Sequence, residues 1–463
     1  MMGHRFGGRV AFPVTIGLGV GLVVSFLLGL SPARETNVIL ITVDTLRADH
    51  LGAYGYARNT SPKIDRFAKE GTLFRYAFSH SPQTNPSLSS LMTSHYPYET
   101  KVLHNEHMLP PGAVTMAEIL KAKGYRTGAV VSNPSLRRGS GFEQGLDEYD
   151  DHLEDMVRGR KGVERIAPKT TLAAIKWLEG NYKKKFFLWV HYMDPHGPYT
   201  PPSPYNTMFV ERPAGGTKRL PFTQGRSGIG RIPHYQRLGD RQDPEFYISQ
   251  YDGEIRFFDE SFGRLIEKIQ ELGLLNNSLI IFTADHGEGM GDHDYYFAHH
   301  EFLYNGLIHV PLIVRLPGQS SEAKEVLYPV GHIDLLPTVL DAVSITPSQP
   351  FKGRNLWTQG KERDIFSETH GMARRYALIR NGMKLIQSKK GYELYNLHKD
   401  FAETVNLMND KMSSTVSAEI ADLKKELEAV RQHDSLALGN PIPLSGDTQT
   451  QTRRRLRALG YVQ

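Results

Sequence analysis

Five short apolar runs constrain the fold of this 463-residue chain more than any other feature. They are NVILITVD at 37–44, TGAVVSN at 127–133, KFFLWVHYMD at 185–194, SLIIFTADHG at 278–287 and HVPLIVRLPG at 309–318. Uninterrupted apolar strands that alternate with amphipathic helices are typical of a parallel sheet covered on both faces. The predicted fold class is therefore α/β, with a mostly parallel central sheet flanked by helices.

Polar side chains stand where these runs end. The residues are Asp44, Asn133, His191, Asp194, Asp285 and His286. In open α/β sheets, ligands bind beyond the carboxyl ends of the strands. The sequence therefore predicts a functional site that is assembled from several strand ends.

The composition excludes several classes of site. The chain has no cysteine, so disulfides, zinc–thiolate sites and a cysteine nucleophile are all ruled out. Its formal net charge is only +5, and it contains no basic helix with interleaved aromatic residues. We therefore expect no nucleic-acid partner.

The N-terminus carries a signal about the compartment. Residues 10–30 contain no charged side chain, and at about 1.5 Å per residue this stretch can cross a hydrocarbon core of about 30 Å. Arg5 and Arg9 precede it without any acid, and positive flanks of this kind stay in the cytoplasm. The alternative is a signal peptide that is cleaved near Ala33. We expect a protein of the bacterial cell envelope, membrane-anchored through this helix, with an extracytoplasmic or periplasmic catalytic domain.

Changes of pattern along the chain predict three parts. They are a transmembrane anchor or signal segment at 1–35, a catalytic domain at 36–345, and a smaller C-terminal α+β unit with a tail at 346–463. Residues 201–245 lack periodicity and are rich in Pro, Gly and Arg. We expect them to form a long surface excursion beside the site.

The C-terminal part shows two patterns of its own. Turn signals at 381–382 (Asn-Gly) and 390–391 (Lys-Gly) divide residues 376–400 into short apolar segments, which predicts a hairpin or meander. Residues 413–433 have the period of an amphipathic helix. Together these patterns predict the α+β character of this part.

Two strand ends carry residues that suit a metal ion. Asp285 and His286 are adjacent on a glycine turn in TADHGEG, and Asp44 closes the first apolar run. A buried carboxylate is costly unless it is paired or bound to a metal. Two alternatives stay open: Asp285 caps backbone groups beside a surface His286, or Asp44 forms an ion pair with Arg47.

One hydroxyl stands two residues before a proline in SPQTNPSLSSLMTSHYP, residues 81–97. This residue, Thr84, is either a nucleophile or part of an Asn85-Pro86 turn in which Ser87 caps the following helix. The local pattern favours the turn, because capped turns are far commoner than active sites.

Several segments stand in an order that one enzyme family shares. They are NVILITVDTLRADHLGAYGY, TSPKIDRFAKEGTLFRYAFS, the hydroxyl-x-Pro-Ser element, YDGEIRFFD, TADHGEG, HVPLIVRLPG and the late segment GYELYNLHKDFAETVNL. From about residue 36 to 410 the chain resembles the sulfatase family within the alkaline phosphatase superfamily. The resemblance implies an alkaline-phosphatase-like fold and an ester hydrolase or phosphoryl-group transferase.

The resemblance also implies roles for single residues. The metal ligands would be Asp44, Thr84, Asp285 and His286. The catalytic residues would be Thr84 as the nucleophile, His196 in DPHGPY as a contact to the substrate or leaving group, and His299. The further substrate contacts we expect are Arg47, His191 and Asn105.

The chain departs from the family at several motifs, two of which bear directly on the chemistry. Sulfatases carry Cys-x-Pro-Ser-Arg, or a serine version of it, and oxidise the first residue to formylglycine, whereas this chain has Thr84 and, in place of the arginine, Leu88. The second of two adjacent aspartates in the calcium sulfatases is here Thr45, which favours Mn²⁺ or Zn²⁺, with Ca²⁺ as the alternative. The departures resemble the phosphoethanolamine and phosphoglycerol transferases, which use an unmodified threonine.

The chemistry of threonine favours phosphate over sulfate. A formylglycine hydrate expels sulfate by returning to the aldehyde, but a threonine sulfate ester has no such exit. A phosphothreonine can be resolved by in-line attack of water or of an acceptor hydroxyl. We therefore predict a metal-dependent hydrolase or transferase that acts on phosphate esters through a covalent Thr84 intermediate. Its substrate would be a phospho- or sulfo-ester, carried on a lipid head group or a cell-envelope glycan.

Two alternative functions stay open. The first is a sulfuric ester hydrolase that works without formylglycine. The second is a catalytically silent family member that binds an anion or a glycan. The intact set of Asp44, Asp285 and His286 argues against the silent alternative, because a degenerate site should lose its ligands first.

Overall fold

The computed structural model describes most of the chain from residue 35 onward. The described residues are 35–157, 160–211, 218–319, 323–348, 350–358, 364–371, 373–409, 414–433 and 440–443. The stretch 10–30, which is predicted to span a membrane, lies outside them, as do Arg5, Arg9 and Ala33. Among the helices of the described part, none has the length and apolar character needed to cross a membrane.

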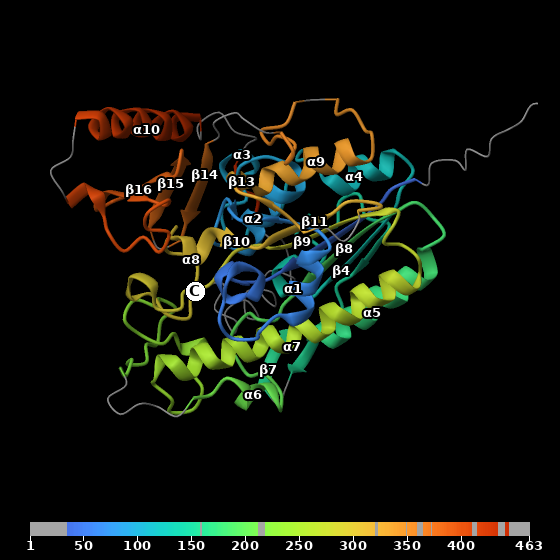
Figure 1. Cartoon of the computed structure of the whole chain (residues 1–463), viewed down its shortest axis with the longest axis horizontal. Coiled ribbons are helices and arrows are strands. Elements are labelled where there is room, and N and C mark those ends of the chain that lie inside the picture. Colours follow the sequence, from blue (N-terminus) through green and yellow to red (C-terminus); the bar gives the residue numbers. More distant parts are fainter. Residues whose placement is uncertain are drawn as a thin grey trace, which may run out of the picture. The chain divides into compact units, whose positions relative to one another are not determined.

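An eight-stranded sheet forms the centre of the fold (Figure 1). In spatial order its strands are β12 (Lys324–Val326), β2 (Thr72–Phe74), β11 (Leu312–Arg315), β9 (Ser278–Ala284), β1 (Asn37–Val43), β8 (Phe186–Tyr192), β4 (Arg126–Val131) and β5 (Glu148–Asp150). β1 pairs in parallel with β8 and β9, and β4 pairs in parallel with β8 and β5. Every residue of β1, β8 and β9 is buried, as expected for strands covered on both faces. The predicted α/β class with a mostly parallel sheet is confirmed.

The run HVPLIVRLPG departs from the parallel pattern. It forms two short strands, β10 (His309–Val310) and β11, on either side of Pro311. β11 pairs antiparallel with β9 and β2, while β10 joins β3 (Ala77–Phe78) and β13 (Val330–Gly331) in a separate three-stranded sheet. Proline has no N–H to donate to a ladder, so it separates the two strands. The expectation of a fifth parallel strand was wrong here.

Helices cover the central sheet on both faces (Figure 1). One face carries α5 (Ala167–Asn181), α7 (Pro244–Glu271) and, packed against α7, α1 (Pro62–Lys69). The other face carries α2 (Thr84–Thr93), α4 (Met116–Ala122) and α9 (Leu335–Ala342). The strands are therefore shielded from water on both sides, which explains why their apolar runs are continuous rather than alternating.

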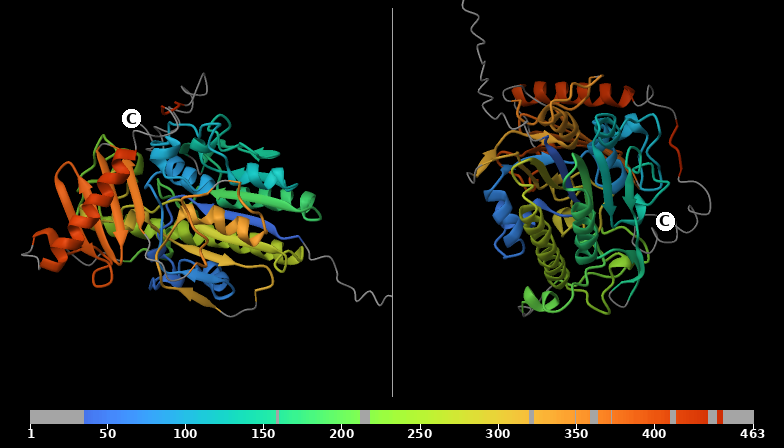
Figure 2. Two further views of the ribbon diagram at one scale, coloured as in Figure 1. Left: turned by 90° about the horizontal axis from the view of Figure 1, so that it is seen from above. Right: turned by 90° about the vertical axis from the view of Figure 1, so that its right-hand side faces the viewer.

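A smaller antiparallel sheet follows in the sequence (Figure 2). Its strands, in order, are β14 (Ile365–His370), β15 (Arg374–Arg380), β16 (Met383–Ser388) and β17 (Gly391–Asn396), and α10 (Ser414–His433) packs against it. Asn381 and Gly382 join β15 to β16 with φ values of 51° and 75°, as a tight Asn-Gly hairpin turn requires. The predicted meander and α+β character are confirmed. Residues from Glu35 onward form one compact unit, so the boundary at 345 stays a prediction.

Shorter elements connect these parts. They are α3 (Pro97–Thr100), α6 (Tyr205–Met208), α8 (Asn305–Ile308) and the hairpin of β6 (Glu154–Val157) and β7 (Arg160–Glu164). In the described part of the predicted excursion 201–245, regular structure is confined to α6, a 3-10 turn at His234–Gln236 and the first residues of α7. The aperiodic sequence thus forms an irregular segment. The charge of one of its side chains, Arg226, acts on a histidine of the site described below.

Candidate active site

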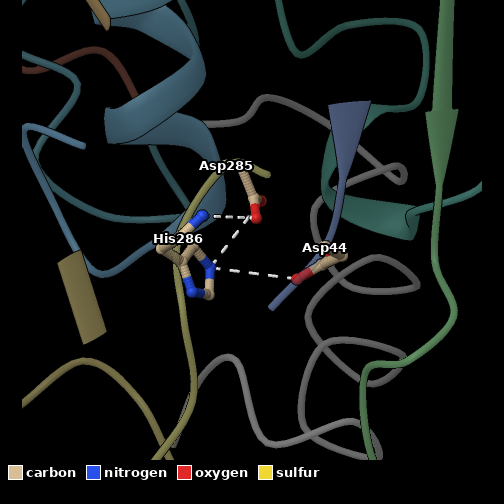
Figure 3. A group of neighbouring side chains, drawn as sticks. All are labelled: Asp44, Asp285 and His286. Atoms are coloured by element: carbon tan, nitrogen blue, oxygen red, sulfur yellow. Dashed lines mark hydrogen bonds and ion pairs between the residues drawn. The ribbon is translucent and has the colours of Figure 1, made fainter. Parts of the chain in front are cut away.

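Three side chains with metal-ligand chemistry meet at the ends of two neighbouring strands (Figure 3). Asp44 follows β1 and Asp285 follows β9, and the Asp285 N–H donates to the carbonyl of Val43 at 3.0 Å. The Nε2 atom of His286 lies 3.8 Å from Asp44 Oδ1 and 3.7 Å from Asp285 Oδ2. All three side chains are fully buried. The parallel pairing of β1 and β9 therefore assembles the cluster that the sequence predicts.

Electrostatics make this cluster unfavourable without a cation. Burial raises the pKa of Asp285 well above its ordinary value, and the charge of Asp44 raises it further. Burial also acts to raise the pKa of Asp44, but nearby His196, His191 and His286 hold it well below its ordinary value. Burial lowers the pKa of His286, so this imidazole is neutral near pH 7. A divalent ion would relieve the repulsion between the two carboxylates.

The hydrogen bonds of His286 prepare it to bind a metal. Its Nδ1 lies 2.9 Å from the carbonyl of Gly287, which can only accept, so Nδ1 carries the proton and Nε2 carries a lone pair. Within the described residues, neither His286 Nε2 nor Asp285 Oδ2 has a hydrogen-bond partner. Buried polar atoms without partners are costly. The donor set of two carboxylates and one imidazole therefore fits a divalent metal, with Mn²⁺ and Zn²⁺ suited to it.

Of the two structural alternatives, the ion pair between Asp44 and Arg47 was wrong, and the other is confirmed only in the capping role of Asp285. The guanidinium of Arg47 does not pair with Asp44: it pairs with Asp49 at 2.6 Å and with Asp292, and it donates to the carbonyl of Glu288 at 3.0 Å. Asp285 does accept from backbone N–H groups, but His286 is buried rather than at the surface. Since Arg47 is already occupied by two acids, its predicted contact with substrate stays a prediction.

Thr45 stands where the calcium sulfatases have a second aspartate. It contacts the cluster of Asp44, Asp285 and His286 through its backbone N–H. Its N–H donates to Asp285 Oδ1 at 3.1 Å. Its φ of 54° places a β-branched residue in the left-handed region, which is rare and strained. Strain of this kind concentrates at functional sites, where the surrounding structure holds it in place.

Thr84 is the first residue of α2, and this helix is tied directly to the metal cluster. The Ser87 hydroxyl donates to the carbonyl of Asp285 at 2.5 Å. Thr84 is fully buried, and its Oγ1 has no hydrogen-bond partner within the described residues. The sequence expectation that Ser87 caps this helix was wrong, because the helix begins earlier, with Gln83 as its N-cap. A free hydroxyl at a helix N-terminus is well placed to meet an anionic group.

Asn105 contacts the residue after Thr84, and its predicted contact with substrate stays a prediction. Its Oδ1 accepts from the backbone N–H of Asn85 at 2.9 Å. Its side chain is only 1% exposed, and Nδ2 has no hydrogen-bond partner within the described residues. A buried amide donor next to Thr84 can bind an oxygen of a bound ester.

A pair of histidines extends the site beyond the metal cluster. The ring centroid of His299 lies 4.6 Å from that of His286 and 5.2 Å from that of His196. The Nδ1 atom of His299 lies 3.2 Å from Glu288 Oε1, and the Tyr199 hydroxyl donates to the other oxygen of this carboxylate at 3.0 Å. The structure therefore brings both predicted catalytic histidines to the metal cluster.

Burial shifts the pKa values of the two histidines and of Glu288 in opposite directions. Burial lowers the pKa of His196 to about 4, and burial together with the charge of His286 lowers the pKa of His299 well below its ordinary value. Burial raises the pKa of Glu288 to about 7. Near neutral pH the Glu288–His299 pair can therefore hold one proton between a carboxyl group and a neutral imidazole.

The remaining strand-end residues divide into two groups. Asn133 donates through Nδ2 to Asp44 Oδ2, and His191 Nε2 lies 3.9 Å from the same oxygen, so both belong to the site. Asp194 instead accepts from the N–H of Ala167 at 2.8 Å, at the start of α5. The substrate contact predicted for His191 stays a prediction.

Two residues near the site were not singled out from the sequence. Glu288 stands two places after His286 in TADHGEG, so the motif itself could have pointed to it. Arg226 lies in the aperiodic excursion, and its charge acts on His299. No local pattern could have found it, because its place depends on how that excursion folds back.

Comparisons with known proteins agree with this geometry. Residues 36–345 match the sulfatase family, and residues 291–433 match the C-terminal region of N-sulphoglucosamine sulphohydrolase. This chain belongs to the sulfatase family. It is an ester hydrolase of the sulfatase and alkaline phosphatase superfamily, whose members depend on metal ions.

Over the aligned residues, curated relatives are about a quarter identical in sequence to this chain. The chain is 25% identical over 350 residues to the ulvan-active sulfatase of Formosa agariphila, covering 70% of this chain and 64% of that protein. It is 25% identical over 416 residues to the multifunctional alkaline phosphatase superfamily protein PehA of Trinickia caryophylli, covering 72% and 79%. For an arylsulfatase of Clostridium perfringens the identity is 26% over 448 residues, covering 81% and 91%.

Solved structures share the fold. The phosphonate monoester hydrolase of Agrobacterium radiobacter superposes with a TM-score of 0.69 at 20% identity, covering 86% of this chain and 96% of that chain. A putative sulfatase from Bacteroides thetaiotaomicron superposes with a TM-score of 0.70 at 20% identity, covering 90% and 96%. The alkaline-phosphatase-like fold predicted from the sequence is therefore confirmed.

Proposed function

We propose that the protein is a metal-dependent hydrolase or transferase of phosphate esters that forms a covalent intermediate on Thr84. The observation that carries the proposal is the place of this hydroxyl. It is buried at the N-terminus of α2, tied through Ser87 to the carbonyl of Asp285, and without a hydrogen-bond partner in the described part of the chain. Because the chain has no cysteine, a formylglycine derived from cysteine is impossible.

The reaction would begin with a substitution at phosphorus. A bond forms between Thr84 Oγ and phosphorus, and the bond between phosphorus and the ester oxygen breaks. His196 donates from Nδ1 to the carbonyl of Gly197 at 2.8 Å, so its Nε2 has a lone pair that can take the Thr84 proton. His299 gives its Nε2 proton to the leaving oxygen and receives the Glu288 proton on Nδ1. A divalent ion held by Asp44, Asp285 and His286 would supply charge stabilisation for the phosphoryl oxygens.

The second step would release the enzyme. Water or an acceptor hydroxyl attacks phosphorus, and the bond between phosphorus and Thr84 Oγ breaks. Thr84 recovers its proton from His196, while the attacking hydroxyl gives its proton to the Glu288–His299 pair. Each group thus returns to its first protonation state, as a turnover cycle requires.

A decisive experiment is mass spectrometry of the peptide that contains Thr84, after incubation with matched phosphate and sulfate esters. We expect a phosphorylated Thr84, and loss of both label and turnover in Thr84→Ala. Thr93→Ala is a matched control, because Thr93 lies in the same helix and its hydroxyl donates to the carbonyl of Ser89 at 2.6 Å. Full metal-dependent turnover by Thr84→Ala would show that the nucleophile is another residue.

A sulfuric ester hydrolase without formylglycine is the second candidate. It is favoured by relatives such as the arylsulfatase of Clostridium perfringens and the ulvan-active sulfatase of Formosa agariphila. The same assay separates the two functions, since sulfate release without any phosphothreonine would support the second. A catalytically silent protein would show neither product, and the purified chain would carry no Mn, Zn or Ca.

The carrier of the ester and the compartment belong to the same proposal. We infer an envelope glycan or lipid head group as the carrier, supported by similar proteins whose names mention ulvan and k-i-k-neocarrahexaose. The charge-free stretch 10–30 supports an extracytoplasmic site. Protease treatment of intact spheroplasts tests this location: the catalytic domain should be degraded, and its full protection would contradict the proposal.

A further inference from the structure

A cavity of about 480 Å³ opens beside the loop that follows α3. Its lining includes His104, His107, His370, Arg374, Lys389 and Pro441. These residues come from the loop after α3, from the β14–β15 and β16–β17 connections of the C-terminal sheet, and from the segment 440–443. The cavity therefore joins the main fold to the C-terminal sheet.

One wall of this cavity is tied to the residue after Thr84. Asn85 Nδ2 donates to the carbonyls of Asn105 at 3.2 Å and of His107 at 3.4 Å. The ring centroids of His104 and His107 lie 5.0 Å apart, and the His107 N–H donates to the carbonyl of His104 at 3.0 Å. This tight turn fixes two imidazoles relative to the start of α2.

The opposite wall is tied to the residue before Thr84. Gln83 Nε2 donates to Thr369 Oγ1 at 3.5 Å, and Thr369 directly precedes His370 in β14. Both neighbours of the nucleophile thus bind a wall of the cavity. A ligand that occupies the cavity would extend from the ester that Thr84 attacks.

The cavity carries an excess of positive charge. The exposed side chains of Arg374 and Lys389 have no hydrogen bond or ion pair within the described residues. Of the histidines, only His370 has an acidic partner, Glu368, at 2.6 Å from its Nε2. Burial lowers the pKa of His104 to about 4, and nearby His107, His370 and Arg374 act in the same direction. Two cations and neutral N–H donors suit an oxyanion.

A further cation acts electrostatically on both this cavity and the active site. The charge of Arg226 acts on His104 in the cavity and on His299 beside the metal cluster. Its Nε is buried without a hydrogen-bond partner, and its guanidinium forms no ion pair within the described residues. Burial lowers the pKa of Arg226, while Glu106 and Glu301 act in the opposite direction, so its charge can add to the attraction for an anion at either site.

We propose that this cavity is a subsite for a second anionic group of the substrate. The group would be a sulfate, phosphate or carboxylate on the same molecule as the ester that Thr84 attacks. The substrate class is therefore a polyanionic ester rather than an isolated monoester. The inference rests on the proposed function, since it takes Thr84 as the point of attack.

The test compares substrates that differ by one anionic group. The pairs are glucose 6-phosphate with glucose 1,6-bisphosphate, and glucosamine 6-sulfate with glucosamine 2-N,6-O-disulfate. We expect kcat/KM to be about 10- to 100-fold higher for the doubly charged member, as for charge-assisted hydrogen bonds. In the double variant Arg374→Ala/Lys389→Ala this ratio should fall towards one. Lys390→Ala is the matched control, because Lys390 is an exposed neighbour outside the cavity lining, and it should keep the ratio.

Direct binding separates failure of this inference from failure of the proposed function. The dissociation constant of glucosamine 2-N,6-O-disulfate is measured by calorimetry for the wild type, the double variant and Lys390→Ala. If the wild type turns over no ester but the double variant binds about 10-fold more weakly, the subsite stands and the proposed function fails. Turnover with a ratio near one in the wild type, or an unchanged ratio in the double variant, overturns the subsite.

Discussion

The active site and the C-terminal sheet both bury polar groups, but they satisfy them in different ways. In the C-terminal sheet, Lys384 Nζ lies 2.7 Å from Glu403 Oε1 and donates to Asn305 Oδ1 at 2.9 Å. The other oxygen of Glu403 accepts from the backbone N–H of Asn305 at 2.5 Å. In the active site, Asp285 Oδ2, His286 Nε2 and Thr84 Oγ1 have no hydrogen-bond partner in the described part of the chain.

The difference separates a structural network from a binding site. A buried ion pair with its own hydrogen bonds offsets the cost of leaving water, and it needs no further group. Partnerless atoms keep that cost until a ligand arrives. The active site thus holds groups that cost free energy when they are unpaired and that could bind an ion or a substrate. Four experiments test this contrast, from the largest expected effect to the smallest.

Asp285→Asn should lower turnover on the order of 10³-fold while leaving the metal-free fold intact. The reason is that burial and Asp44 already raise the pKa of Asp285, so a neutral amide removes an unfavourable charge. Initial rates and urea unfolding of the metal-free protein measure the two effects. A large loss of stability would mean that the cluster is a structural network after all.

Lys384→Met should lower the free energy of unfolding by about 3–5 kcal/mol, because it leaves the buried carboxylate of Glu403 without its counter-charge. Urea denaturation gives the value. The double variant Lys384→Met/Glu403→Gln should recover most of the loss, since the amide can still accept from the Asn305 N–H. Equal stability of the single variant and the wild type would contradict the role assigned to this pair.

Removal of the metal should lower the free energy of unfolding by about 2–3 kcal/mol when the ion had been present at about 100 times its dissociation constant. Thermal unfolding with and without Mn²⁺ after dialysis against a chelator measures this. The stabilisation should vanish in Asp285→Asn and persist in Lys384→Met. A metal effect that survives in Asp285→Asn would place the ion at other residues.

Asp259 offers an intermediate case, a buried carboxylate that has backbone hydrogen bonds and one counter-charge, Arg256 Nη1 at 3.5 Å. It accepts from the backbone N–H groups of Lys63 and Ile64, at the start of α1. Burial raises its pKa to about 7 from an ordinary value of 3.8. The protonated form is therefore favoured in the folded protein, and this contribution to stability is lost as the pH rises from about 4 to about 7.

The variant Asp259→Asn removes that titration while keeping an oxygen acceptor for α1. Urea unfolding at pH 4.5 and pH 7.5 should show a smaller fall of stability with pH in the variant than in the wild type. Parallel pH dependence in the two proteins would show that this carboxyl titrates normally in the fold. The comparison then tells whether backbone hydrogen bonds and the longer contact with Arg256 are enough to keep this buried carboxylate ionised.

Much of the active site could be predicted from the sequence, because it depends on local patterns. Apolar runs that end in polar residues gave the strands, and parallel pairing of β1 and β9 brings Asp44 to Asp285 and His286. The hydroxyl-x-Pro-Ser element pointed to Thr84 at the start of a helix. Only the exact helix start was missed there, because the N-cap, Gln83, has no characteristic capping side chain.

Tertiary structure alone decided which distant groups meet. Arg47 binds Asp49 and Asp292 rather than Asp44, and the charge of Arg226 comes within reach of His299. Lys384 finds Asn305 across 79 positions of the chain. Such contacts depend on how whole helices and strands pack. The sequence around a single charged residue does not show which distant residue it will contact. By itself the sequence determined the parallel core strands and the residues of the reactive cluster. The fold decided which distant residues meet, because a long-range contact leaves no periodic pattern in the sequence.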